Sequence, residues 1–166
     1  MGGLFSLTTL ASSLVILPTD TTLAVDSSTL MPSVQMETVK SFNNILPGYT
    51  GVSQGYHWGH PGIDLTAPLG TKIYPLKPGR VSKILNLRWD YGRAVIVDHA
   101  NGLVTLYAHM GKLYVQEGEE VTMEKPLGEV GLTGKTTGPH LHFEIVKNGG
   151  QLNPLPLLAL GSPTAR

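Results

Sequence analysis

One stretch limits the fold of this chain more than any other: residues 93–110, which read RAVIVDHANGLVTLYAHM. Two runs rich in apolar residues lie on either side of Asn101-Gly102. Successive side chains of a strand point to opposite faces of a sheet, and Asn-Gly is the strongest short signal for a tight hairpin turn. The stretch therefore predicts two antiparallel strands joined at this turn.

The chain after residue 46 repeats the same kind of pattern. Short apolar runs at 79–85 and 140–146 predict two more strands, and Gly, Pro and Asn separate the runs. Another turn is predicted within 146–152, and no segment has a sustained helical period. With 166 residues, of which 41% are hydrophobic, the chain is long enough to bury a core. We predict a mainly β fold, an antiparallel β-sheet domain over residues 46–156.

The N-terminal part of the chain has a different character. The apolar run 4–17 is too short and too polar for a membrane span, but it has the length of the apolar core of an export signal, and a small-residue cleavage site ends at Ala24. Residues 1–39 hold neither Lys nor Arg, which such a signal normally carries at its start. We expect 1–45 to be a leader, an export signal followed by a linker; an inhibitory segment and a truncated linker are the alternatives. We expect residues 157–166 to form a C-terminal tail.

Charge and cysteine content narrow the choice of partners. Lys plus Arg and Asp plus Glu number twelve each, and the formal net charge is zero. Without a basic run there is no electrostatic reason to expect a nucleic acid or an anionic membrane as partner. We therefore expect no nucleic acid as partner. We also expect no stable membrane span and a monomer. Because the chain has no cysteine, a bound metal would have to be held by histidine and carboxylate.

The histidines are the residues on which chemistry could depend. His140 and His142 are one residue apart at the start of a predicted strand, so they should share one face of it. His60 and Asp64 are four residues apart in a loop that contains Pro and Gly, which could bring both side chains to one centre. His109 ends the second strand of the hairpin, and the alternation places it on the face shared by Thr105 and Tyr107.

Catalytic zinc needs three protein ligands and one open position for water. One carboxylate and two imidazoles suit zinc, whereas a fourth protein ligand would close the site. If the site is catalytic, one of His140 and His142 must therefore stay off the metal, and with His109 it would be free to handle protons. The spacing does not decide which of the two it is. We interpret His57 and His99 as bystanders.

Three separated blocks of the sequence carry a family resemblance. In order and spacing they resemble the lysostaphin/LytM-type zinc metalloendopeptidases, which have the duplicated hybrid motif fold. The resemblance covers about residues 46–156 and leaves the leader outside. The blocks are GHPGIDLTAPLGTKIYPLKPGRV (59–81), YGRAVIVDHANGLVTLYAHM (91–110) and GEVGLTGKTTGPHLHFEIVKNGGQLNP (128–154).

The resemblance implies a role for each candidate residue. It implies that His60, Asp64 and His142 bind one zinc ion per chain, and that His109 and His140 are catalytic. It also implies a bacterial, extracytoplasmic enzyme, in the periplasm, in the cell envelope or secreted, that hydrolyses peptide cross-links of peptidoglycan with zinc-activated water. The alternative is a non-catalytic cell-wall or amidase-activating module that retains the zinc ligands.

Other points stay open on the sequence alone. The bond that is cut could lie in a glycine bridge or in a cross-link between stem peptides. Tyr49 or Tyr56, both upstream of the first predicted ligand, could assist at the oxyanion. The glycines of 131–138 could shape a wall of the substrate groove or could only make turns.

Overall fold

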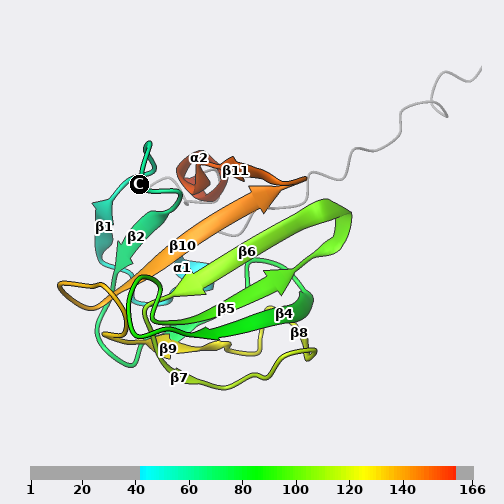
Figure 1. The fold of residues 1–166 in the computed structure, drawn as a ribbon, viewed down its shortest axis with the longest axis horizontal. Coiled ribbons are helices and arrows are strands. Elements are labelled where there is room, and N and C mark those ends of the chain that lie inside the picture. The colour runs from blue at the N-terminus through cyan, green and yellow to red at the C-terminus, as the bar shows by residue number, and fades with distance from the viewer. Residues whose placement is uncertain (1–41, 160–166) are drawn as a thin grey trace, which may run out of the picture. The chain divides into compact units, whose positions relative to one another are not determined.

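The structure is a computed structural model that describes residues 42–159 of the chain. The larger sheet has eight strands, all paired antiparallel (Figure 1). The predictions for residues 1–41 and 160–166 fall outside the described residues and stay predictions. In spatial order the larger sheet consists of β1 (Gly51–Gln54), β2 (Ile63–Thr66), β10 (His140–Lys147), β6 (Leu103–Ala108), β5 (Arg93–Asp98), β4 (Gly79–Asn86) and β8 (Glu120–Val121), and β11 (Gly150–Leu152) pairs with β10.

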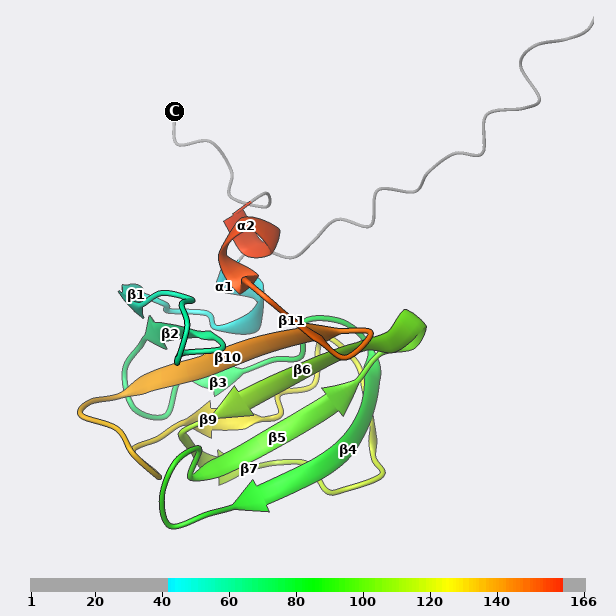
Figure 2. The same ribbon diagram turned by 45° about the horizontal axis from the view of Figure 1, so that its top comes forward.

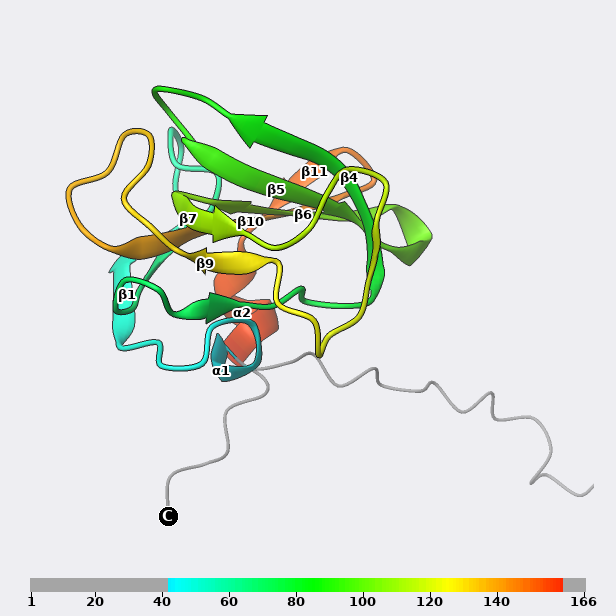
Figure 3. The ribbon, with the colours of Figure 1, turned by 90° about the horizontal axis from the view of Figure 1, so that it is seen from below.

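A second, three-stranded antiparallel sheet closes the core on one face of the larger sheet. Its strands are, in spatial order, β3 (Lys72–Ile73), β9 (Gly128–Val130) and β7 (Met110–Leu113) (Figure 3). Apolar side chains from both sheets form one buried cluster, in which Tyr107 of β6 and Phe143 of β10 stack with ring centroids 5.2 Å apart. The mainly β, antiparallel fold predicted from the sequence is confirmed.

The two predicted turns are present. A 3₁₀ turn over Ala100–Gly102 joins β5 to β6, and both Asn101 (φ 61°) and Gly102 (φ 69°) have the positive φ that a tight hairpin of this kind requires. Asn148 (φ 50°) and Gly149 (φ 81°) turn the chain from β10 into β11 in the same way. Asparagine and glycine tolerate this left-handed backbone better than other residues do, which is why the sequence reveals these turns.

Two short helices flank the sheets. Helix α1 (Phe42–Ile45) precedes β1, and helix α2 (Pro154–Ala159) follows β11 (Figure 2). The sequence pattern did not reveal α2, because six residues are too few to show a helical period. Leu158 of α2 is fully buried in the same cluster as Ile45 of α1, so the core extends to α2. Among residues 42–159, no helix has the length and apolar character needed to cross a membrane.

Candidate metal centre

Strand β10 carries two faces of opposite character. Leu141, Phe143 and Ile145 are fully buried in the core, whereas His140 and His142 point to the other face. The shared face predicted for the two histidines is confirmed. Antiparallel pairing with β2 sets His142 opposite Asp64, so the imidazole and the carboxylate stand next to each other on the outer face of the sheet.

The loop before β2 delivers the third side chain. A bridge between His57 and His60, with two backbone hydrogen bonds, closes a tight turn ahead of the strand. Gly62 then passes directly over β10, where an added Cβ would lie 2.5 Å from the carbonyl oxygen of Phe143 and 2.9 Å from Cγ of Glu144. Only a residue without a side chain can approach β10 this closely, and the approach brings His60 to the other two groups.

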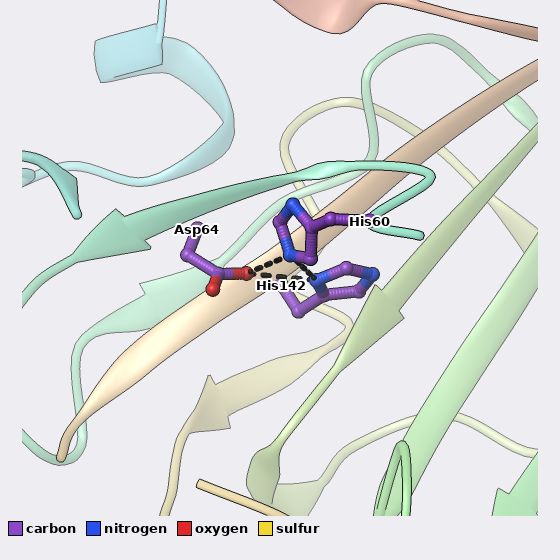
Figure 4. Close-up of side chains that lie close together, drawn as sticks. All are labelled: His60, Asp64 and His142. Atoms are coloured by element: carbon purple, nitrogen blue, oxygen red, sulfur yellow. Dashed lines mark hydrogen bonds and ion pairs between the residues drawn. The ribbon is translucent and has the colours of Figure 1, made fainter. Parts of the chain in front are cut away.

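His60, Asp64 and His142 converge on one point (Figure 4). His60 Nε2 lies 3.2 Å from Asp64 Oδ1 and 3.1 Å from His142 Nδ1, and the last two atoms are 2.7 Å apart. A tetrahedral zinc ion with bonds of about 2.0–2.1 Å places its ligand atoms roughly 3.3 Å apart, close to these spacings. Two imidazoles and one carboxylate are also a donor set that zinc accepts, so the residues fit the ion.

The other ring nitrogen of each imidazole donates a hydrogen bond to an oxygen atom of the protein. His60 Nδ1 donates to the carbonyl oxygen of Gly55 at 2.9 Å, and His142 Nε2 donates to Glu144 Oε1 at 2.9 Å. Such hydrogen bonds fix which nitrogen carries the proton and orient the ring. They leave Nε2 of His60 and Nδ1 of His142 as the nitrogens available to a metal.

Electrostatics at the centre favour a cation. Burial acts to lower the pKa of His142, but hydrogen bonds to Asp64 and Glu144 outweigh it and raise this pKa to about 9. Burial acts to raise the pKa of Asp64, yet the hydrogen bond from His142 and the neighbouring imidazoles keep it below the usual value. Without a metal, His142 is therefore protonated on both ring nitrogens and carries a positive charge. A metal ion would displace the proton from Nδ1.

His109 lies on the same side as the metal-site residues, contrary to the prediction. The alternation along β6 would direct it to the core face with Thr105 and Tyr107, which are both fully buried. Its backbone instead takes a left-handed φ of 57°, and the ring turns to lie 4.7 Å from that of His140, centroid to centroid. This left-handed conformation strains the backbone of His109, so neighbouring contacts must hold the residue in it.

Three hydrogen bonds hold His109 in place. Its N–H donates to the carbonyl oxygen of Tyr91, its own carbonyl accepts from Gly131 N–H, both at 3.0 Å, and its ring Nδ1 donates to the carbonyl oxygen of Thr133 at 2.9 Å. The ring of His140 is held similarly, since its Nδ1 donates to the carbonyl oxygen of Gly138 at 2.8 Å. In both rings Nε2 is left to accept or donate a proton.

All five predicted residues line one groove of about 750 Å³. Burial lowers the pKa of His109, so its ring is neutral near pH 7 and able to accept a proton. Nε2 of His140 lies 3.8 Å from Asp64 Oδ2, which directs this ring toward the metal-site residues. The groove thus combines three convergent ligand atoms with two imidazoles that are tied at Nδ1 alone.

Two loops that lie against each other make one wall of the groove. The loop between β4 and β5 contributes Asp90 and Tyr91, and the loop between β9 and β10 contributes Lys135 and further residues. A Cβ on Gly92 or on Gly134 would collide with the backbone of the other loop. Gly134 therefore allows two loops of the protein to contact each other. The sequence suggested only a role in the substrate groove or in a turn.

The other residues considered from the sequence are not among those that line this groove. His57 is exposed and outside the residues that line it, and His99 is buried at the opposite end of β6. Tyr49 packs against the hydrophobic core, and Tyr56 is 37% exposed, so neither forms part of the groove wall. The tyrosine that does line the groove is Tyr91.

Sequence reasoning missed Tyr91 and Glu144. Glu144 is 3% exposed, and it accepts hydrogen bonds from His142 Nε2 and from the hydroxyl of Tyr91. One signal was available, because period-two alternation places residue 144 on the same strand face as His140 and His142. A carboxylate two residues after His142, on the face that holds both histidines, indicates a hydrogen-bonding partner for an imidazole. Nothing local in the sequence points to Tyr91.

Comparison with known proteins identifies relatives of this arrangement. The DD-carboxypeptidase/endopeptidase Mpg of Neisseria meningitidis is 42% identical over 104 residues, which are 63% of this chain and 24% of that protein. The peptidoglycan DD-endopeptidase ShyA of Vibrio cholerae is 35% identical over 96 residues, 58% of this chain and 22% of that protein. The chain thus spans about a quarter of the length of these curated relatives.

The fold and a family model agree with these relatives. The solved structure of the antimicrobial peptidase lysostaphin from Staphylococcus simulans superposes with a TM-score of 0.63 at 24% identity, covering 78% of this chain and 56% of that one, which supports the fold alone. The model described as Peptidase family M23 matches residues 58–154, more than half of the chain and all five candidate residues. The chain belongs to peptidase family M23.

Proposed function

We propose that the chain is a zinc metalloendopeptidase that hydrolyses peptide cross-links of bacterial peptidoglycan. One observation carries the proposal: three ligand atoms of His60, Asp64 and His142 converge in a groove beside two further histidines. Membership of peptidase family M23 supports the peptidase activity.

His60 Nε2, Asp64 Oδ1 and His142 Nδ1 would hold the ion. A bound zinc ion supplies Lewis acidity, which polarises the scissile carbonyl and lowers the pKa of water. Three protein ligands leave a tetrahedral ion one open position for catalysis. His140 stays off the metal in this assignment, because it is outside the group of convergent ligand atoms and its Nδ1 donates to the carbonyl oxygen of Gly138.

His109 and His140 would handle the protons. The neutral ring of His109 can accept a proton from the attacking water at Nε2, since its Nδ1 is already bonded to Thr133. A protonated ring beside the reacting carbon can then stabilise the negative charge that develops on the carbonyl oxygen and return the proton to the leaving amine. His140, with its ring 4.7 Å from that of His109, can share either role.

The substrate is inferred from the relatives. One curated relative is named a DD-carboxypeptidase/endopeptidase and the other a peptidoglycan DD-endopeptidase. Cross-links between stem peptides are therefore the first substrate to test, with glycine bridges as the comparison. A substrate of this kind lies outside the cytoplasm, which supports an extracytoplasmic location. One zinc ion per chain and a monomeric state remain predictions.

The non-catalytic module is the less favoured alternative. A module that only bound the cell wall would need neither His109 nor His140, yet a strained backbone and three hydrogen bonds hold His109 at the groove. Strain is retained where surrounding contacts enforce it, and it clusters at functional sites. The retained proton-handling pair supports an enzyme.

Purified protein provides the direct test. We expect elemental analysis to find one zinc per chain, and mass spectrometry to show cross-linked muropeptide dimers converted to monomers. A zinc chelator should abolish cleavage and added zinc should restore it. Digests of glycine-bridged peptidoglycan run in parallel distinguish the two bond types. Bound zinc without cleavage of either cross-link would favour the non-catalytic module.

A further inference from the structure

Glu144 is a buried carboxylate with all of its hydrogen-bonding partners supplied by the protein. It is 3% exposed, although it lies on the outer face of β10, because the loop at Gly62 covers it. Oε1 accepts from His142 Nε2 at 2.9 Å and from the hydroxyl of Tyr91 at 2.7 Å, and Oε2 accepts from Gln151 Nε2 at 2.9 Å.

Burying a carboxylate in this position destabilises the fold unless hydrogen bonds compensate for the lost water. Removing an ionised group from water carries a large penalty, which hydrogen bonds and an opposite charge must offset. The three hydrogen bonds from His142, Tyr91 and Gln151 supply this compensation to the two oxygens of Glu144. Glu144 therefore offers two acceptor oxygens directly behind His142, one of the three proposed ligands.

Tyr91 connects this carboxylate to the second half of the site. Its hydroxyl donates to Glu144, while its backbone carbonyl accepts the N–H of His109, the residue with the strained backbone. A tyrosine hydroxyl carries its proton at neutral pH, so the one of Tyr91 is a donor to Glu144. The ring of Tyr91 also lies 5.6 Å from that of His142, centroid to centroid.

We propose that Glu144, held by Tyr91, is a positioning residue that fixes the orientation and protonation of His142 so that Nδ1 alone faces the metal. This inference rests on the proposed zinc site. A carboxylate that accepts the Nε2–H bond raises the basicity of the opposite nitrogen and prevents the ring from flipping. Tyr91 carries the effect further, because one residue holds both the carboxylate behind the ligand and the backbone of His109.

Two substitutions separate the charge from the hydrogen bond. Glu144→Gln keeps an oxygen that can accept from His142 and Tyr91, and the exposed Gln151 can turn its amide to match. Glu144→Ala removes both acceptor oxygens. We expect zinc dissociation constants about 10- to 100-fold higher for Glu144→Ala, with Glu144→Gln between this value and that of the unchanged protein. Glu129→Gln is the matched control, because it removes an equal charge from the small sheet.

Zinc affinity is measured by competition with a chelating dye, and the metal-free fold is followed by thermal unfolding. A purely structural role would lower the unfolding temperature of the metal-free protein and leave the affinity of the folded protein unchanged. Nitrogen NMR of the zinc-loaded protein should show His142 protonated at Nε2 and coordinated at Nδ1. In Glu144→Ala, loss of the hydrogen bond should move the Nε2 signal or allow coordination through Nε2.

The inference is overturned if folded Glu144→Ala binds zinc within about threefold of the unchanged protein, well below the ~10-fold minimum expected. It is also overturned if Glu129→Gln weakens binding equally. If the unchanged protein binds zinc but cleaves no cross-link, the proposed activity fails and the affinities still decide the positioning role. A protein that binds no zinc overturns both proposals.

Discussion

Strand β6 has a buried histidine at each end, and the two histidines differ in the surroundings of one ring nitrogen. His99 precedes the strand and His109 follows it, with exposures of 8% and 7%. Each ring donates Nδ1–H to a backbone carbonyl at 2.9 Å, of Pro78 for His99 and of Thr133 for His109. Burial lowers the pKa of both rings. By burial, tautomer and pKa direction they are alike.

The difference lies at the second ring nitrogen. His99 Nε2 meets the hydroxyl of Thr105 at 2.8 Å, and that hydroxyl lies 3.0 Å from the hydroxyl of Tyr107, so the ring is satisfied on both sides inside the core. Nε2 of His109 has no hydrogen-bonding partner among residues 42–159, and its ring lines the groove. A histidine becomes available for chemistry when one nitrogen is fixed and the other is left free.

The largest effect should come from removing a ligand at the groove. His142→Ala takes away the nitrogen that lies 2.7 Å from Asp64 Oδ1 and 3.1 Å from His60 Nε2. We expect loss of bound zinc and a fall in cleavage of more than about 100-fold, the upper end for residues that only support a ligand. Elemental analysis and muropeptide cleavage measure the two losses. Zinc retained at full stoichiometry would contradict the ligand assignment.

The same substitution at the two ends of β6 tests the comparison itself. His109→Ala should keep zinc and lower kcat/KM by about 10²- to 10⁴-fold, the usual contribution of a general acid or base. His140→Ala should behave likewise. His99→Ala should leave kcat/KM per folded molecule unchanged. A loss of zinc in His140→Ala, with zinc kept in His142→Ala, would reverse the roles of these two residues.

The free energy of unfolding should fall more for His99→Ala than for His109→Ala. His99→Ala leaves the Pro78 carbonyl and the Thr105 hydroxyl without their ring partner in a buried place. We expect a loss of about 1–3 kcal/mol in the free energy of unfolding, the cost of stranding buried polar groups. Urea unfolding of zinc-loaded protein measures it. A destabilisation no larger than that of His109→Ala would remove the distinction between the two ends.

The smallest effect concerns pH. Because burial holds the pKa of His99 below its ordinary value of 6.5, the unfolded chain takes up a proton here before the folded chain does. The stability that this ring contributes is therefore complete above about pH 6.5 and is lost as pH falls toward the folded pKa. Lys77 acts in the same direction and Asp98 against it. The difference in unfolding free energy between the unchanged protein and His99→Ala should shrink from pH 7 to pH 5, and a constant difference would contradict this account.

Much of the fold could be predicted from local patterns. The alternation in 93–110 gave two strands and Asn101-Gly102 gave their turn, because side-chain direction and backbone preference act between near neighbours. The same alternation placed His140 and His142 on one face. It failed at His109, where a left-handed φ interrupts the period and redirects the ring. Periodicity carries no information on such a single residue.

The sequence by itself determined four strands, two turns and the set of five candidate residues, all of which lie within the match to peptidase family M23. Only the tertiary structure decided which atoms converge, because His60 and His142 are 82 residues apart and meet through the pairing of β2 with β10 and the close passage of Gly62. It alone revealed Tyr91 and Glu144 behind the candidate ligands. Residues that position a ligand need only a fitting contact in space, and contacts between distant segments leave no period in the chain.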